Sequence, residues 1–295
     1  MFYFGIVFSA IFGAVLGSFA VAQVWRLRAA QFADSEKNSD EFSEEERQKL
    51  KSLVGVKAKD DRSHCLNCGY QLRWFDLIPI ISWLSLGGKC RKCRHKIGAT
   101  EVLAETGLAV IFAALFVVFF EAVKQNPLFG IGRLVILFAS AVALTILFVY
   151  DAKWSLLPTK TLWIFNILAG IYCFTTILQS NISVSLFYNL VLSIICFPGI
   201  YLVLTLLSKG AWVGDGDWIL ALGLVLLLPI SPINSMLMLF FSNIIGLIII
   251  VAVSILNKEK LKRGAQIPFG PAMILACLLV IILQPIIEKI FILTI

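Results

Sequence analysis

The chain has 295 residues, of which 59% are hydrophobic and 15% are charged, and its mean hydropathy is +0.91. A soluble domain is ordinarily about 45–50% apolar and about 25% charged. This composition therefore excludes a soluble enzyme, a disordered chain and a small secreted disulfide-rich protein. The net charge of +7 is compatible with nucleic-acid binding, but the basic residues are distributed as in a membrane protein.

Eight apolar stretches are long enough, or nearly so, to cross a membrane, which takes about 20 residues. The sequence therefore predicts an all-α polytopic membrane protein with about eight transmembrane helices. The expected spans are residues 2–24, 102–123, 132–150, 160–179, 184–208, 217–231, 234–256 and 268–293. The sixth is the shortest of them. Three parts follow: a first transmembrane helix (1–24), a polar loop (25–101), and helices 2–8 (102–295).

The polar loop carries most of the positive charge, because 15 of the 25 Lys and Arg lie between Arg26 and Lys96. If this loop is cytoplasmic, the opposite side of the membrane keeps only Lys124, Arg133 and Lys289. That asymmetry is the positive-inside pattern of membrane proteins. We therefore expect a cytoplasmic loop, both termini on the other side, the lipid bilayer as a partner, and no nucleic acid. Within the loop, residues 40–53 form either a short solvated helix or a flexible linker.

Four of the seven cysteines form two pairs in this loop, Cys65-Leu-Asn-Cys68 and Cys90-Arg-Lys-Cys93. Two Cys-x-x-Cys pairs about 20 residues apart are typical of a zinc site. Four thiolates complete a closed tetrahedral site, so the metal would be structural. A disulfide is the alternative, and a reducing cytoplasm disfavours it. His64 and His95 flank the pairs, but four thiols already suffice.

An apolar segment, residues 74–84, runs between the two cysteine pairs and is too short to span a membrane. Two interpretations remain open for it. It either packs against the zinc site as an apolar plug or lies on the face of the bilayer.

Several carboxylates lie at or near the depth of the membrane, where an ionisable side chain is costly and is a functional candidate. Asp151 follows the third apolar run, and Asp215 and Asp217 lie in Gly214-Asp-Gly-Asp217 before the sixth. All three fall at the cytoplasmic ends of expected spans. Two carboxylates that share a proton can act as acid and base, as in aspartic proteases. Glu105 and Glu121 lie within or beside the second span.

The whole chain resembles the type IV prepilin peptidases, which are intramembrane aspartic proteases of the Gly-x-Gly-Asp type. The resemblance rests on five motifs in their order along eight spans. They are Gly17-Ser-Phe19, the cysteine pairs enclosing Ile-Pro-Ile-Ile-Ser-Trp, Asp151 with Leu156-Leu-Pro158, Gly214-x-Gly-Asp217, and Pro268-Phe-Gly-Pro271. It implies that Asp151 and Asp217 are the catalytic pair, with Asp215 at the variable position. It also implies that Cys65, Cys68, Cys90 and Cys93 hold zinc.

The resemblance further implies the reaction. Such enzymes cut the basic leader peptide from type IV prepilins or type II secretion pseudopilins at the cytoplasmic face of the bacterial inner membrane. Many then methylate the new N-terminus with S-adenosylmethionine. The expected partners are therefore the N-terminal segments of prepilins or pseudopilins.

Departures from the family pattern cluster near the polar loop rather than at the carboxylates. Val21 stands where the family has Asn, and Ala29 stands where it has Pro after an Arg. Thr100, Glu101 and Val102 replace Arg-Tyr-Pro, and Ile219 replaces a Lys. The family links the loop to methyl transfer, so the protease is expected and the methyltransferase is left open.

Two other classes of function compete with the protease. A polytopic transporter would use the membrane carboxylates as ion or proton sites, but that interpretation leaves the cysteine pairs and the motif order unexplained. A pilin-binding assembly factor without catalysis would explain the resemblance, but the intact Asp pair counts against it.

Overall fold

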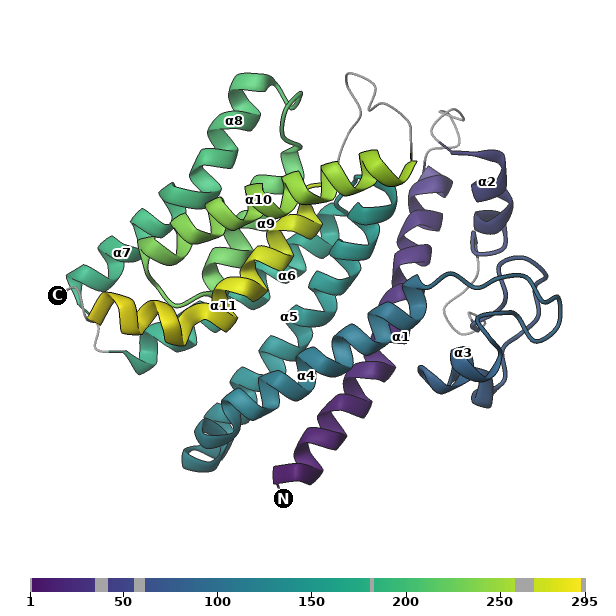
Figure 1. Ribbon diagram of the computed structural model, residues 1–295, viewed down its shortest axis with the longest axis horizontal. Coiled ribbons are helices and arrows are strands. Elements are labelled where there is room, and N and C mark those ends of the chain that lie inside the picture. The colour runs from purple at the N-terminus through teal and green to yellow at the C-terminus, as the bar shows by residue number, and fades with distance from the viewer. Residues whose placement is uncertain (1, 35–41, 56–61, 181–182, 258–267, 293–295) are drawn as a thin grey trace. The chain divides into compact units, whose positions relative to one another are not determined.

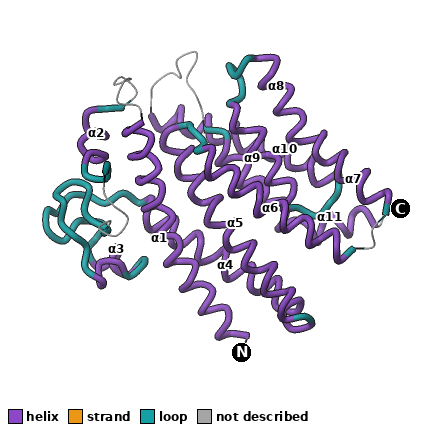
Figure 2. The backbone as a smooth tube through the Cα atoms, turned by 180° about the vertical axis from the view of Figure 1, so that it is seen from behind, coloured by secondary structure: helices purple, strands orange, loops and turns teal. Residues whose placement is uncertain are grey.

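The computed structural model describes residues 2–34, 42–55, 62–180, 183–257 and 268–292. The described residues are helical apart from turns and two isolated β-bridges (Figures 1 and 2). The chain divides into two compact units, Met1–Leu134 and Val135–Ile295. The basic stretch with Lys258, Lys260, Lys262 and Arg263, expected on the cytoplasmic side, lies outside the described residues.

The first unit is built on two long helices, α1 (Phe2–Asp34) and α4 (Thr100–Gln125), which pack side by side. Glycines on α1 permit the close approach. A Cβ added at Gly17 would lie 2.6 Å from the Cα of Glu105, and one at Gly13 would lie 2.5 Å from the carbonyl oxygen of Leu108. Small residues allow membrane helices to approach closely. The pairing order, with Gly17 opposite Glu105 and Gly13 opposite Leu108, makes the two helices antiparallel.

The loop between these helices contains three short helical elements, α2 (Glu44–Lys51), η2 (Trp74–Leu77) and α3 (Ile81–Ser85). The alternative of a short helix within residues 40–53 is therefore confirmed. Helix α2 docks on α1 through Arg28, a buried side chain whose Nε donates to Glu46 Oε1 at 2.8 Å. The guanidinium of Arg28 also lies 4.2 Å from the ring centre of Phe42.

The second unit begins within α5 (Pro127–Trp154) and contains the remaining helices. These are α6 (Thr159–Gln179), α7 (Val184–Ile194), the π-helical turn η3 (Ile195–Gly199), α8 (Ile200–Ser208), α9 (Asp215–Leu227), α10 (Pro232–Asn257) and α11 (Gly270–Ile292). Pro198 lies in the π-helical turn, where a missing backbone N–H interrupts the α-helical ladder. The core of the second unit is an apolar cluster that includes Phe165, Leu220 and Met273.

The structure bears out a polytopic membrane protein, since a helix lies at each of the eight expected spans. Within the described residues, six helices are long and apolar enough to cross a membrane. They are α1, α4, α5, α6, the continuous run Val184–Ser208, and α10. Of the other two, α9 has 13 residues, and α11 has 23, of which the described apolar stretch is Gly270–Gln284.

Candidate active site and metal centre

Asp151 lies in the last turn of α5 and is buried, with 4% of its surface exposed. Its Oδ2 accepts the backbone N–H of Gly270 at 2.8 Å, a contact between residues 119 positions apart in the chain. Gly270 is the first residue of α11. The Gly270 backbone lies so close to Asp151 that a Cβ at this position would stand only 2.7 Å from the same oxygen. Glycine at this position is therefore a packing requirement of the carboxylate.

Asp217 lies in the first turn of α9 and is held in a similar way. Its Oδ2 accepts the backbone N–H of Gly214 at 3.0 Å. A carboxylate at this position satisfies an N–H that the start of a helix leaves without a partner, and it meets the positive end of the helix dipole. Asp217 is half-buried, whereas Asp215 is exposed. In the described ranges, no other side-chain hydrogen bond reaches Asp151 or Asp217.

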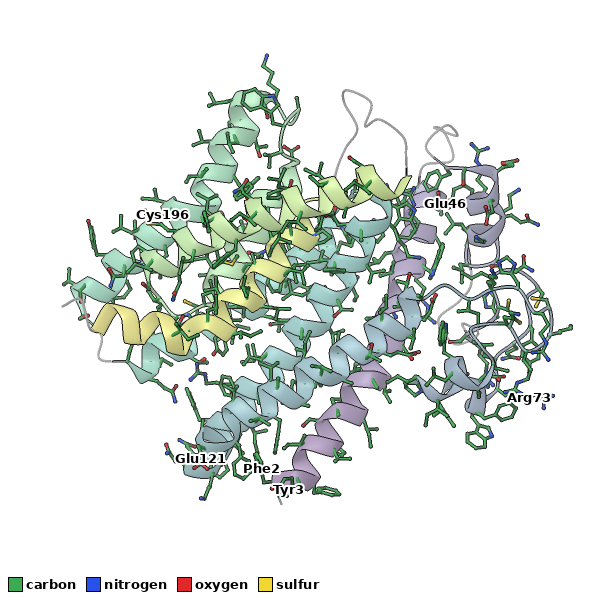
Figure 3. All side chains as sticks on the ribbon, in the orientation of Figure 1. Phe2, Tyr3, Glu46, Arg73, Glu121 and Cys196 are labelled. Atoms are coloured by element: carbon green, nitrogen blue, oxygen red, sulfur yellow. The ribbon has the colours of Figure 1, made fainter. Side chains whose placement is uncertain are left out.

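Asp151 and Asp217 belong to the same unit and lie close enough to interact electrostatically. The other acidic candidates take different positions. Glu105 is buried in the first unit, where its Oε2 accepts the backbone N–H of Ile80 at 2.6 Å. Glu121 is exposed near the far end of α4 (Figure 3). Among the acidic candidates that the structure describes, Asp151 and Asp217 therefore combine proximity to one another with positions at helix ends.

Sequence reasoning missed one polar group beside this pair. Tyr201 is buried on α8, and its hydroxyl lies 3.2 Å from Ser242 Oγ on α10. Its ring packs against Phe269 of the Pro268-Phe-Gly-Pro271 motif, with 5.7 Å between the ring centres. Tyr201 also lies near enough to Asp217 for an electrostatic interaction. The sequence did carry a signal for Tyr201, because a polar hydroxyl inside an apolar span needs a hydrogen-bond partner.

The four loop cysteines come together as the sequence predicted. Their sulfurs lie within 4.8 Å of one another, with 3.9 Å between Cys65 and Cys93 and 4.0 Å between Cys68 and Cys90. Four sulfurs around one zinc ion, each about 2.3 Å from it, would stand roughly 3.8 Å apart. All four cysteines are free. The donor set and spacing therefore fit one tetrahedral metal ion, and not a pair of disulfides.

The two cysteine pairs sit on matching turns. The N–H of Gly69 donates to the carbonyl of Cys65 at 2.9 Å, and the N–H of Arg94 donates to that of Cys90 at 3.0 Å. Gly69 has φ +68°, and Arg94 takes the same left-handed region with φ +60°. The residue after each second cysteine therefore needs a conformation that glycine adopts without cost.

The thiols differ in their ease of ionisation. The backbone N–H of His95 lowers the pKa of Cys93 to about 6, whereas burial raises the pKa of Cys65 to about 12. The Cys93 thiolate therefore forms readily, whereas Cys65 needs the charge of a metal ion to ionise. The ring of His64 is engaged elsewhere, with Nδ1 3.0 Å from the carbonyl oxygen of Arg62 and Nε2 3.2 Å from Ser52 Oγ.

Comparison with known proteins places this arrangement in context. Residues 11–119 match the family model described as the bacterial peptidase A24 N-terminal domain. A protein from Dichelobacter nodosus named prepilin leader peptidase/N-methyltransferase is 26% identical over 289 residues, which cover 92% of this chain and 89% of the relative. A protein of the same name from Aeromonas salmonicida is 28% identical and covers 93% and 88%.

A third relative with this name, from Vibrio cholerae, is 32% identical over 123 residues, covering 42% of this chain and 45% of the relative. No solved structure matches the chain. The similarity to the peptidases extends over about nine tenths of the chain. Residues 11–119 therefore resemble the bacterial peptidase A24 N-terminal domain, and most of the chain resembles the prepilin leader peptidases.

Proposed function

We propose that this protein is a prepilin peptidase, which cleaves the basic leader peptide from type IV prepilins or type II secretion pseudopilins. Asp151 and Asp217 carry the reaction. The observation that supports this most directly is their shared setting, in which each carboxylate accepts the N–H of a glycine at the start of a helix. The names of the relatives support the substrate class. They give no support to the alternative of a transporter.

The two carboxylates divide the chemistry of peptide hydrolysis. One of them, ionised, takes a proton from water as the water oxygen bonds to the scissile carbonyl carbon. The other, protonated, donates a hydrogen bond to the carbonyl oxygen. When the C–N bond breaks, the leaving amine takes a proton from the acid, and the pair returns to its shared-proton state.

The backbone N–H groups of Gly270 and Gly214 fix the orientation of the carboxylates before the substrate arrives. Each binds Oδ2 of its aspartate, so the other carboxylate oxygen can address water or substrate. Catalytic groups held in place in this way lower the entropic cost of reaching the transition state. The apolar N-terminal helix of the substrate lies in the membrane, and its basic leader stays at the face where Asp151 and Asp217 lie.

The site residues and the topology complete the proposal. Cys65, Cys68, Cys90 and Cys93 hold a structural zinc ion, which stabilises the fold of the loop and takes no part in cleavage. The protein lies in the bacterial inner membrane with residues 25–101 in the cytoplasm, and residues 102–295 carry the protease site.

Methylation of the new N-terminus is the second proposed activity, with S-adenosylmethionine as the methyl donor. The relatives carry methyltransferase in their names, which supports it. The buried carboxylate of the first unit, Glu105, already binds the backbone N–H of Ile80. That contact occupies one oxygen of Glu105, and the proposal assigns no residue to S-adenosylmethionine.

The test is the N-terminus of a prepilin co-expressed with the full chain, read by intact-mass and N-terminal mass spectrometry. Loss of the leader supports the protease, and an additional methyl group on the new N-terminus supports the transferase. If type IV prepilins and pseudopilins both kept their leader peptides in this experiment, the result would contradict the proposal.

A further inference from the structure

The apolar segment between the cysteine pairs, residues 74–84, has two different faces. Its inner face packs against the metal centre: Asp76 Oδ1 accepts Arg91 Nε at 2.7 Å, and Trp83 Nε1 donates to the carbonyl of Gly98 at 3.2 Å. The indole of Trp83 also lies over Gly88, where an added Cβ would be 2.9 Å from it. The segment is therefore held rigidly to the loop on one side.

The outer face of the segment is apolar and uncovered within the first unit. The exposed fractions are 77% for Trp74, 43% for Leu77, 65% for Ile81 and 62% for Leu84. Trp74 and Leu77 lie on η2, and Ile81 and Leu84 lie on α3. We name Trp74, Leu77, Ile81 and Leu84 the apolar stripe. Large apolar side chains gathered in this way mark a contact surface.

The position of the stripe along the membrane helices indicates what covers it. The N–H of Ile80 binds Glu105, and Glu105 packs against Gly17 of α1. The first charged side chain of α1 is Arg26, nine residues beyond Gly17, which is about 13 Å along the helix axis. Ile80 therefore lies beside the apolar part of α1. Figures 1 and 2 agree, since α3 stands alongside the middle of α1.

The charges around the stripe match a membrane surface. Arg73 precedes the stripe and is exposed (Figure 3), and Lys89, Lys92 and Arg94 are exposed on the adjoining turns. Between residues 62 and 99, Asp76 is the one acidic residue, and it is paired with Arg91. Basic side chains beside an apolar stripe fit anionic headgroups above acyl chains. A tryptophan at the edge of such a stripe has the interfacial preference of its type.

We propose that residues 74–84 insert into one leaflet of the bilayer, with the apolar stripe among the acyl chains and the basic turns at the headgroups. The segment then anchors the metal-binding loop to the membrane at the face where α1 leaves it and α4 enters it. The inner face packs on the metal centre, as the first interpretation predicts, and the proposal assigns the second interpretation, contact with the bilayer, to the outer face. This inference does not depend on the proteolytic activity.

The experiment places a photo-crosslinking benzoylphenylalanine at Leu77 or Ile81 of the full chain in bacterial membranes. The matched control is the same residue at Glu45, an exposed position on α2. Irradiation should give phospholipid adducts at positions 77 and 81, found by mass spectrometry, and few or none at 45. Adducts with another protein, with a second copy or with the second unit of this chain would overturn the proposal, as would equal lipid labelling at all three positions.

A second measurement avoids the crosslinker. The wild-type chain and Trp74→Phe are reconstituted in nanodiscs whose lipids carry bromine on the acyl chains. The difference between the two fluorescence spectra belongs to Trp74, and bromine should quench it strongly. A Trp74 contribution that is unaffected by brominated lipid but quenched by iodide in water would place the stripe in solvent and overturn the proposal.

Discussion

Asp151 and Asp217 are held by equivalent contacts, because Oδ2 of each accepts the N–H of a glycine at the start of a helix. The distances are 2.8 Å from Gly270 and 3.0 Å from Gly214. The start of a helix offers unpaired N–H groups and a positive dipole end, so it suits a carboxylate. Helices α11 and α9 therefore each contribute one such contact, and together they fix both members of the proposed catalytic pair.

The contact with Gly270 predicts a sensitive position. The variant Gly270→Ala would place a Cβ 2.7 Å from Asp151 Oδ2 and should displace that carboxylate. A misplacement of about 1 Å can cost about a hundredfold in rate, so cleavage of prepilin should fall by up to that factor. The control is Gly170→Ala on α6, where nothing lies within 4 Å. Equal cleavage by both variants would contradict the role given to Gly270.

The matching turns of the metal centre predict an effect of backbone conformation alone. Gly69 has φ +68° and open space around it, so Gly69→Ala adds strain without a clash. The left-handed conformation costs about 1–2 kcal/mol for other residues, which should weaken zinc binding about tenfold in a competition with a chelator. Gly107→Ala, which also has open space but lies in helix α4, should bind zinc as the wild type does. Equal zinc affinity of Gly69→Ala and the wild type would contradict the role given to this turn.

The contact between Ile80 and Glu105 predicts how the loop is fastened to α4. Ile80 has φ +63°, a strained conformation for a β-branched residue. Glu105→Ala removes the acceptor of its N–H and leaves that donor unsatisfied, at a cost of about 1–3 kcal/mol. Hydrogen exchange at residues 78–84 should therefore become faster. Glu121→Ala, an exposed change at the other end of α4, serves as the control, and unchanged exchange in Glu105→Ala would contradict the contact.

The buried ion pair of α1 and α2 predicts a loss of stability. Arg28→Ala leaves Glu46 without its partner and also removes the cation–π contact with Phe42. Loss of one partner from a buried pair costs about 3–5 kcal/mol, so the first unit should unfold at a lower denaturant concentration. Lys49→Ala breaks only the exposed pair with Glu45 and should leave the midpoint unchanged. Similar unfolding midpoints for the two variants would show that the Arg28–Glu46 pair does not stabilise the first unit more than an exposed ion pair does.

Much of the architecture could be predicted from the sequence, because apolar run length and cysteine spacing are local signals. The helices and the gathering of Cys65, Cys68, Cys90 and Cys93 follow from them. Contacts between distant residues could not be predicted. The pairing of Asp151 with Gly270 spans 119 positions, and the place of Tyr201 near Asp217 depends on the packing of α8.

The central claim is that Asp151 and Asp217 together cleave the leader peptide, and one comparison tests it most directly. A prepilin is co-expressed with the wild-type chain, Asp151→Asn, Asp217→Asn or Asp215→Asn, and its N-terminus is read by mass spectrometry. Each enzyme variant is first shown to reach the membrane in equal amount. The account predicts an uncut prepilin with Asp151→Asn and Asp217→Asn and a processed one with Asp215→Asn. Normal processing by either of the first two variants would contradict it.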